Sequence, residues 1–247
     1  MRELARFGDG ISAHESSRAA CRCSCSQQTA TDLNKGLRGN QMRTYSVVLG
    51  GCLMLALTVP VEAHFKLLSP APWIVEEDDF GDPQWSYPCG GTLTDQGKPT
   101  GAVTKLEGGE KLHLRIQEMA FHPGFYRVAL AVNSRSELPP DPEPISKTGP
   151  DGRQRSISGA IQYPPAPPIL ADGLFMHTAP LDEIQEAEIE IPNINCTKCT
   201  LQVIEFMASH VRNPDGDYTY HHCADLQVHA NPNKPIDTRF STENKEH

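Results

Sequence analysis

The chain has 247 residues and carries 31 acidic against 22 basic side chains, which gives a formal net charge of −9 at pH 7. This acidic balance argues against binding to nucleic acids or to anionic membranes. No second apolar span follows residue 63, so we expect a soluble exported product without a membrane anchor.

The first 63 residues are expected to be absent from the mature protein. Residues 1–41 are polar and precede the usual start of a signal peptide, so we expect translation to begin at Met42 and residues 1–41 to be a spurious upstream extension. Residues 42–63 read as a signal peptide. They have a basic start, an apolar run over 46–60 that is too short to span a bilayer, and small residues before the cut.

The expected cleavage site lies between Ala63 and His64, which leaves residues 64–247 as one secreted or periplasmic domain. Cleavage there frees the α-amine of His64, so this residue offers both an amine and an imidazole nitrogen. Each binds a metal only when unprotonated, and the reference pKa of an α-amine, roughly 7.7–8, lets a divalent transition metal displace its proton near neutrality. An amino-terminal histidine is therefore a ready chelating group.

Short strands separated by proline-rich loops dominate residues 64–247. Apolar alternation or apolar runs predict strands over 112–116, 126–132, 184–191, 201–206 and 218–228. Proline runs exclude helix at 139–144 and 164–168, and we expect long functional loops over 73–108 and 133–180. This pattern predicts an all-β fold, an immunoglobulin/fibronectin-like antiparallel β-sandwich with long decorated loops.

Four cysteines follow position 63, and an even number in an exported chain predicts two disulfides. Cys196 and Cys199 have the spacing of a zinc or redox pair. Because no second such pair lies nearby and no helix is predicted to follow, we expect a local disulfide between them. A disulfide between Cys89 and Cys223 would tie the loop over 85–91 against the last predicted strand.

Two segments carry further candidate metal ligands. His122 lies in a turn between two predicted strands, where Pro123 and Gly124 would hold it rigidly. The segment 217–226 is the densest cluster, and strand alternation divides its side chains between two faces, only one of which can point at a given metal. One face carries Tyr218, Tyr220 and His222, and the other carries His221, Cys223 and Asp225.

Four motifs occur in order: HFKLLSP at 64–70, YPCGG at 87–91, FHPGFYR at 121–127 and HCAD at 222–225. Together they resemble lytic polysaccharide monooxygenases and their copper-binding relatives, above all bacterial proteins described as polysaccharide-monooxygenase-like. The resemblance covers essentially all of residues 64–247. It implies one copper ion held in a histidine brace, bound by the amine and imidazole of His64 and by the imidazole of His122.

The resemblance also implies roles for residues of the last predicted strand. In active members an aromatic side chain lies over the metal, and we assign this catalytic role to Tyr220. His222 and Asp225 are candidate extra ligands, and coordination by either would suit holding copper better than activating oxygen.

Three functions follow as alternatives. The first is oxidative C–H hydroxylation and cleavage of a polysaccharide substrate at the brace copper, with an external electron donor. In that case Trp73, Trp85 and Tyr87 could form a sugar-binding face. Aromatic residues beside a disulfide, however, more often belong to the core. The second is a copper-binding or copper-delivery protein with a copper-donating or copper-accepting partner and no turnover. The third is a metal-free adhesion or carbohydrate-binding sandwich, which predicts that His64 and His122 lie far apart.

A glycosidase is disfavoured because the spacing of Glu118, Glu205 and Asp225 singles out no acid/base pair. For each of these functions we expect a monomer.

Overall fold

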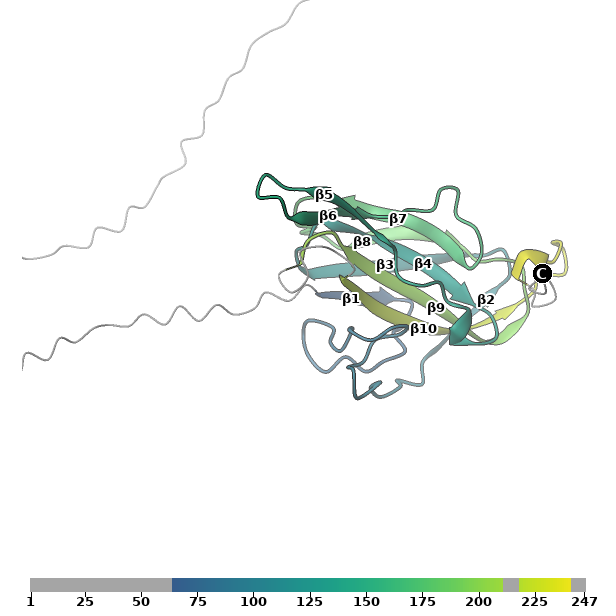
Figure 1. The fold of residues 1–247 in the computed structure, drawn as a ribbon. Helices are drawn as coiled ribbons and strands as arrows, with labels where there is room; N and C mark the ends of the chain where they lie inside the picture. The colour runs from purple at the N-terminus through teal and green to yellow at the C-terminus, as the bar shows by residue number, and fades with distance from the viewer. Residues whose placement is uncertain (1–63, 211–217, 241–247) are drawn as a thin grey trace, which may run out of the picture. The chain divides into compact units, whose positions relative to one another are not determined.

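The computed structural model describes residues 64–210 and 218–240 (Figure 1). The expected upstream extension and signal peptide lie outside these residues. The described part contains ten strands: β1 (His64–Ser69), β2 (Val103–Glu107), β3 (Lys111–Ala120), β4 (Gly124–Ala131), β5 (Pro144–Thr148), β6 (Gln154–Gly159), β7 (Ile169–His177), β8 (Gln185–Glu190), β9 (Cys196–Met207) and β10 (Tyr218–His229). Two short 3-10 helices, Arg135–Glu137 and Thr238–Phe240, complete it. None of the described helices has the length and apolar character needed to cross a membrane.

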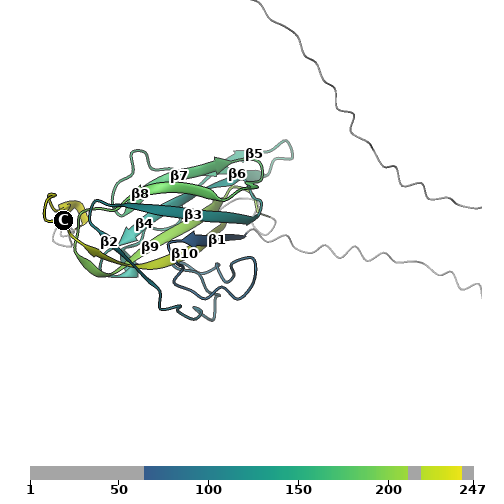
Figure 2. The ribbon, with the colours of Figure 1, turned by 180° about the vertical axis from the view of Figure 1, so that it is seen from behind.

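The strands form an all-β sandwich of two main sheets. One sheet has the strand order β1-β3-β8, and the other has the order β2-β10-β9-β4-β7, while β5 and β6 form a separate hairpin. Figure 2 shows the three-stranded sheet in front of the larger one. Neighbouring strands are antiparallel except for β2 and β10, which run parallel from the pair Val103 and Asp225 onwards.

The core lies between the two sheets. Alternate residues of β3 are buried, because successive side chains of a strand point to opposite faces and only one face of this sheet meets the other sheet. One continuous apolar cluster joins both sheets. The smaller sheet contributes Phe65, Leu67, Leu112, Leu114, Ile116 and Ile189, and the larger sheet contributes Tyr126, Val128, Leu130, Leu201, Val203, Tyr220 and Leu226, among others.

The long loops cover the outer face of the larger sheet. All eight residues of β4 are buried, so this strand is covered on both faces. On the outer side, Trp73 and Leu138 from the loops pack with Ala129 and with the bridged Cys89 and Cys223. The backbone N–H of Trp73 also donates to the Cys223 carbonyl at 2.6 Å. The loop after β1 is therefore held against β10, beside which Figure 1 shows it.

Both expected disulfides are present. Cys89 and Cys223 bridge the loop to β10 with Cα atoms 4.9 Å apart. Cys196 and Cys199 pair locally at the start of β9, with Cα atoms 5.8 Å apart.

The two segments expected to be loops contain four strands. β2 lies inside 73–108, and β5, β6 and β7 lie inside 133–180. β7 escapes sequence prediction because it follows a proline run, contains Gly173 and pairs with β4 in an irregular register. Residues that are not paired with the neighbouring strand interrupt the alternation of buried and exposed side chains by which a strand is predicted.

Candidate functional site

The sandwich gathers four chain segments at one end. His64 at the start of β1 lies opposite Ala120 at the end of β3, so the turn that carries His122 begins beside His64. Met207 at the end of β9 lies opposite both Gly124 and Tyr218. The start of β1, the turn between β3 and β4, the end of β9 and the start of β10 therefore meet.

Aromatic rings form a continuous row across this end. The imidazole of His64 stacks on Tyr220 with ring centroids 5.0 Å apart and an interplanar angle of 16°. Tyr220 meets Tyr218 edge to face at 5.5 Å, and Tyr218 stacks on His210 at 3.9 Å. His210 in turn stacks on His122 at 4.8 Å. Thus His64 and His122 are brought to the same end, and His210 lies between His122 and the tyrosines.

The site keeps two of its imidazoles neutral. Burial, with the nearby His64 adding to it, lowers the pKa of His122 despite the opposing charge of Glu118. Burial, followed by the charges of His122 and His64, lowers the pKa of His210 to about 4. Neutral imidazole is the form that binds a metal, so these two side chains are ready ligands at neutral pH.

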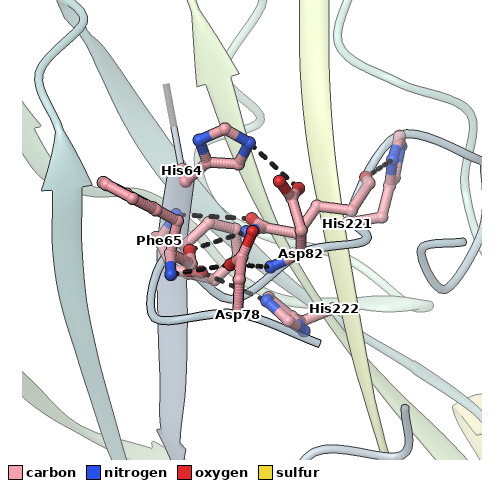
Figure 3. A network of polar contacts seen from close by, with 8 residues as sticks. His64, Phe65, Asp78, Asp82, His221 and His222 are labelled. Carbon is pink, nitrogen blue, oxygen red and sulfur yellow. Dashed lines mark hydrogen bonds and ion pairs between the residues drawn. The ribbon is translucent and has the colours of Figure 1, made fainter. Parts of the chain in front are cut away.

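Asp82 faces the imidazole of His64 (Figure 3). Its Oδ1 lies 2.9 Å from His64 Nε2, within ion-pair distance but off the line of a hydrogen bond. Asp78 shapes the loop that carries Asp82, because its Oδ1 accepts hydrogen bonds from the backbone N–H groups of Phe80 at 2.7 Å and of Asp82 at 3.3 Å. The carboxylate is thus positioned by its own loop.

Asp82 contacts the nitrogen of His64 that cannot join a chelate with the α-amine. A chelate through the α-amine closes a small ring with Nδ1, whereas Nε2 of the same side chain lies too far from that amine. Asp82 meets the far nitrogen. A carboxylate at the non-ligating nitrogen of a histidine fixes the ring orientation and raises the basicity of the other nitrogen.

His222 is held beneath the start of β1. Its Nε2 lies 3.2 Å from the carbonyl of Phe65, to which it donates, and its ring packs edge to face on the Phe65 ring at 4.8 Å. Burial lowers the pKa of His222 to about 4. Gln84, itself fully buried, accepts a hydrogen bond from Phe65 N–H at 3.3 Å, so both backbone groups of Phe65 are fixed.

The remaining candidate ligands, His221 and Asp225, lie on the face of β10 that points away from His64, as the alternation of side chains predicts. His221 lies on the outer side, where its Nε2 is 2.9 Å from Asp141. Asp225 is also away from His64, because it contacts Arg135 at 3.5 Å and lies five residues beyond Tyr220, about 17 Å along a strand. The structure therefore places His64, His122 and Tyr220 at the same end of the sandwich, linked through Tyr218 and His210, and leaves Asp225 outside this group.

Exposed aromatic side chains surround the site. The ring of Phe80 is 49% exposed and lies 6.0 Å from that of His64. Trp85 and Tyr87, 38% and 46% exposed, line a hollow of about 370 Å³ together with Tyr218. Trp73, by contrast, packs against the disulfide on the outer face of the sheet.

Sequence reasoning missed His210 and Asp82. The signal for His210 was present, because it lies four residues after the end of the predicted strand 201–206 and an antiparallel partner beginning at Tyr218 would lie beside it. Asp82 gave no such signal, because a loop with no regular period determines its contact with His64.

Comparisons with known proteins assign no family to this site. No protein-family model matches the chain, and no curated protein or solved structure does either. The function is therefore argued from the side chains that the fold brings together.

Proposed function

We propose that the protein, once cleaved before His64, is an exported copper-binding protein that holds one copper ion through the amine and imidazole of His64 and the imidazole of His122. The observation that carries this proposal is the gathering of His64, His122 and His210 at one end of the sandwich. The imidazole nitrogens of these three residues do not all lie within 4.8 Å of one another, so the side chains would close around the ion, and His210 would then complete a nitrogen-rich donor set. Imidazole and amine nitrogens suit copper better than the carboxylate-rich sets that favour magnesium or calcium.

The chemistry of the donor set fits the metal. The lowered pKa values of His122 and His210 leave their lone pairs available at neutral pH. Before cleavage the nitrogen of His64 belongs to a peptide bond and cannot coordinate as an amine. Copper binding is therefore coupled to export, where the free amine is produced.

Holding copper is favoured over turnover by the burial of the site and by Asp82. His64 and His122 are only 4% and 7% exposed, and the Asp82 carboxylate lies against His64. A negative group at the ligand stabilises a bound cation. A protein of this kind would exchange copper with a donating or accepting partner.

Oxidation of polysaccharides is the second candidate, and the exposed aromatic side chains support it. Phe80, Trp85 and Tyr87 offer apolar faces on which sugar rings can stack. Bound copper would supply the redox chemistry, with electrons from an external donor. Tyr220, fully buried against the His64 ring, would fix the orientation of that ligand.

Copper titration of the protein that begins at His64 tests the proposal. We expect His122→Ala to weaken Cu(II) binding by more than about 100-fold, because even the loss of groups behind a ligand costs about 10–100-fold. The matched control is His113→Ala, since His113 is an exposed histidine paired with Glu188 on β8. Wild-type affinity in His122→Ala would refute the site. Oxidised sugar products, formed from a polysaccharide by the copper-loaded protein with a reductant, would favour the second candidate over the first.

A further inference from the structure

A second cluster of metal-ligating side chains lies within the sandwich. Glu118 of β3, His177 of β7 and Glu205 of β9 place one ligand atom each within 4.8 Å of the others, the only such group of three in the described residues. The side chains of Glu118 and His177 are 3% and 4% exposed, and Glu205 is fully buried. The cluster joins one strand of the smaller sheet to two strands of the larger sheet.

The hydrogen bonds of His177 orient it as a ligand. Its Nδ1 lies 2.8 Å from the carbonyl of Phe175, which can only accept, so Nδ1 carries the proton. Its Nε2 then points at Glu118 Oε1, 2.9 Å away. A metal-ligating histidine commonly donates its other ring N–H to a backbone carbonyl in this way.

The backbone of Phe175, whose carbonyl accepts the hydrogen bond from His177, adopts an unusual conformation. Phe175 has φ 49°, the only positive value at a non-glycine position in the described chain. This region costs energy for a bulky side chain and is found where the surrounding structure enforces it, often at functional sites. The pairing of β7 with β4 is irregular over the same stretch.

Glu205 is aimed into the cluster without a hydrogen bond. Neither of its carboxylate oxygens has a hydrogen-bond partner among the described residues, although the Tyr126 hydroxyl lies beside it. A buried carboxylate without a partner is costly unless a proton or a cation neutralises it. Burial, and then the charge of Glu118, raise the pKa of Glu205 well above its usual range. Although burial opposes it, the hydrogen bond with Glu118 raises the pKa of His177, so a metal ion that enters the cluster would displace a proton from this imidazole.

We propose that Glu118, His177 and Glu205 bind a divalent transition-metal ion, with zinc as the best fit, at a site separate from His64. Two oxygens and one nitrogen from three side chains form a set typical of zinc, which leaves a fourth position for water or for Tyr126. Ligand atoms of a tetrahedral zinc with bonds of about 2.1 Å lie about 3.4 Å apart, so the cluster needs to close by at most about 1.4 Å at its widest. The ion would fasten the two sheets together behind the turn that carries His122.

Zinc titration of the mature protein with His122→Ala, which disables the proposed copper site, tests this proposal. We expect one Zn²⁺ per chain and a rise in melting temperature on adding Zn²⁺. Adding Glu205→Gln, which is nearly isosteric, should weaken Zn²⁺ binding by more than about 100-fold, because removing even a group behind a ligand costs about 10–100-fold. The control Glu188→Gln, exposed on β8, should leave binding unchanged.

Two outcomes would overturn the proposal: no zinc bound by the His122→Ala protein, or equal zinc binding with and without Glu205→Gln. Should Glu205→Gln fail to fold, Glu118→Gln replaces it and the same criteria apply. X-ray absorption of the zinc-loaded His122→Ala protein provides a second measurement. One imidazole and two or more oxygen ligands are expected, whereas two imidazoles would place the ion elsewhere.

Discussion

His222 makes the stability of the protein depend on pH. It is fully buried, and burial, opposed by the Phe65 carbonyl, lowers its pKa from 6.5 to about 4. Between these values the unfolded chain binds a proton that the folded chain does not bind, so stability is lost as the pH falls from 6.5 to 4. At about 1.4 kcal/mol per pH unit the loss is about 3 kcal/mol at pH 4 and about 2 kcal/mol at pH 5.

Urea unfolding of the metal-free protein between pH 7.5 and 4 measures this loss. His222→Gln retains an N–H donor for the Phe65 carbonyl but cannot titrate, so its stability should fall by about 2 kcal/mol less than that of the wild type between pH 7.5 and 5. His229→Gln, an exposed position at the end of the same strand, should follow the wild type. The reasoning is refuted if wild type and His222→Gln show parallel pH profiles, or if the His222 ring titrates near 6.5 by NMR.

Three further predictions concern copper and stability. Asp82→Asn removes the charge beside His64 and should weaken Cu(II) binding about 10–100-fold in a chelator competition; unchanged affinity would place Asp82 outside the site. Replacing both Cys89 and Cys223 with alanine opens a link across 134 residues and should lower the free energy of unfolding in urea by about 4–5 kcal/mol, whereas a loss below about 1 kcal/mol would contradict this. Arg127→Met removes the cation paired with the fully buried Asp172 carboxylate and should cost about 3–5 kcal/mol in the same assay; a neutral effect would show that the N–H groups of Gln162 and Gly173 alone stabilise the charge of Asp172.

Much of the sandwich could be predicted because its inner strands repeat simple patterns. The strands around Leu114 and Val128 show alternation or apolar runs, which reflect burial on one face or both. β7 could not be predicted in this way, because its irregular pairing and Gly173 interrupt the period. The parallel pairing of β2 with β10 is long-range and leaves no local signal.

The candidate site was partly visible for a related reason. His64 and His122 stand out because an expected cleavage site and a rigid turn mark them, and alternation places Tyr220 and His222 on one face. Asp82 could not be found, because its position depends on a loop that folds back onto β1. The contacts of Glu205 arise only when β3 meets β7 and β9.

The proposed copper site depends on the free amine of His64, and a copper titration of two forms of the protein tests this dependence most directly. One form begins at His64, and the other carries a single glycine before it, which leaves the imidazole intact but replaces the amine with a peptide nitrogen. We expect tight binding of one Cu(II) by the first form and a large loss of affinity in the second. Equal binding by both forms would contradict it.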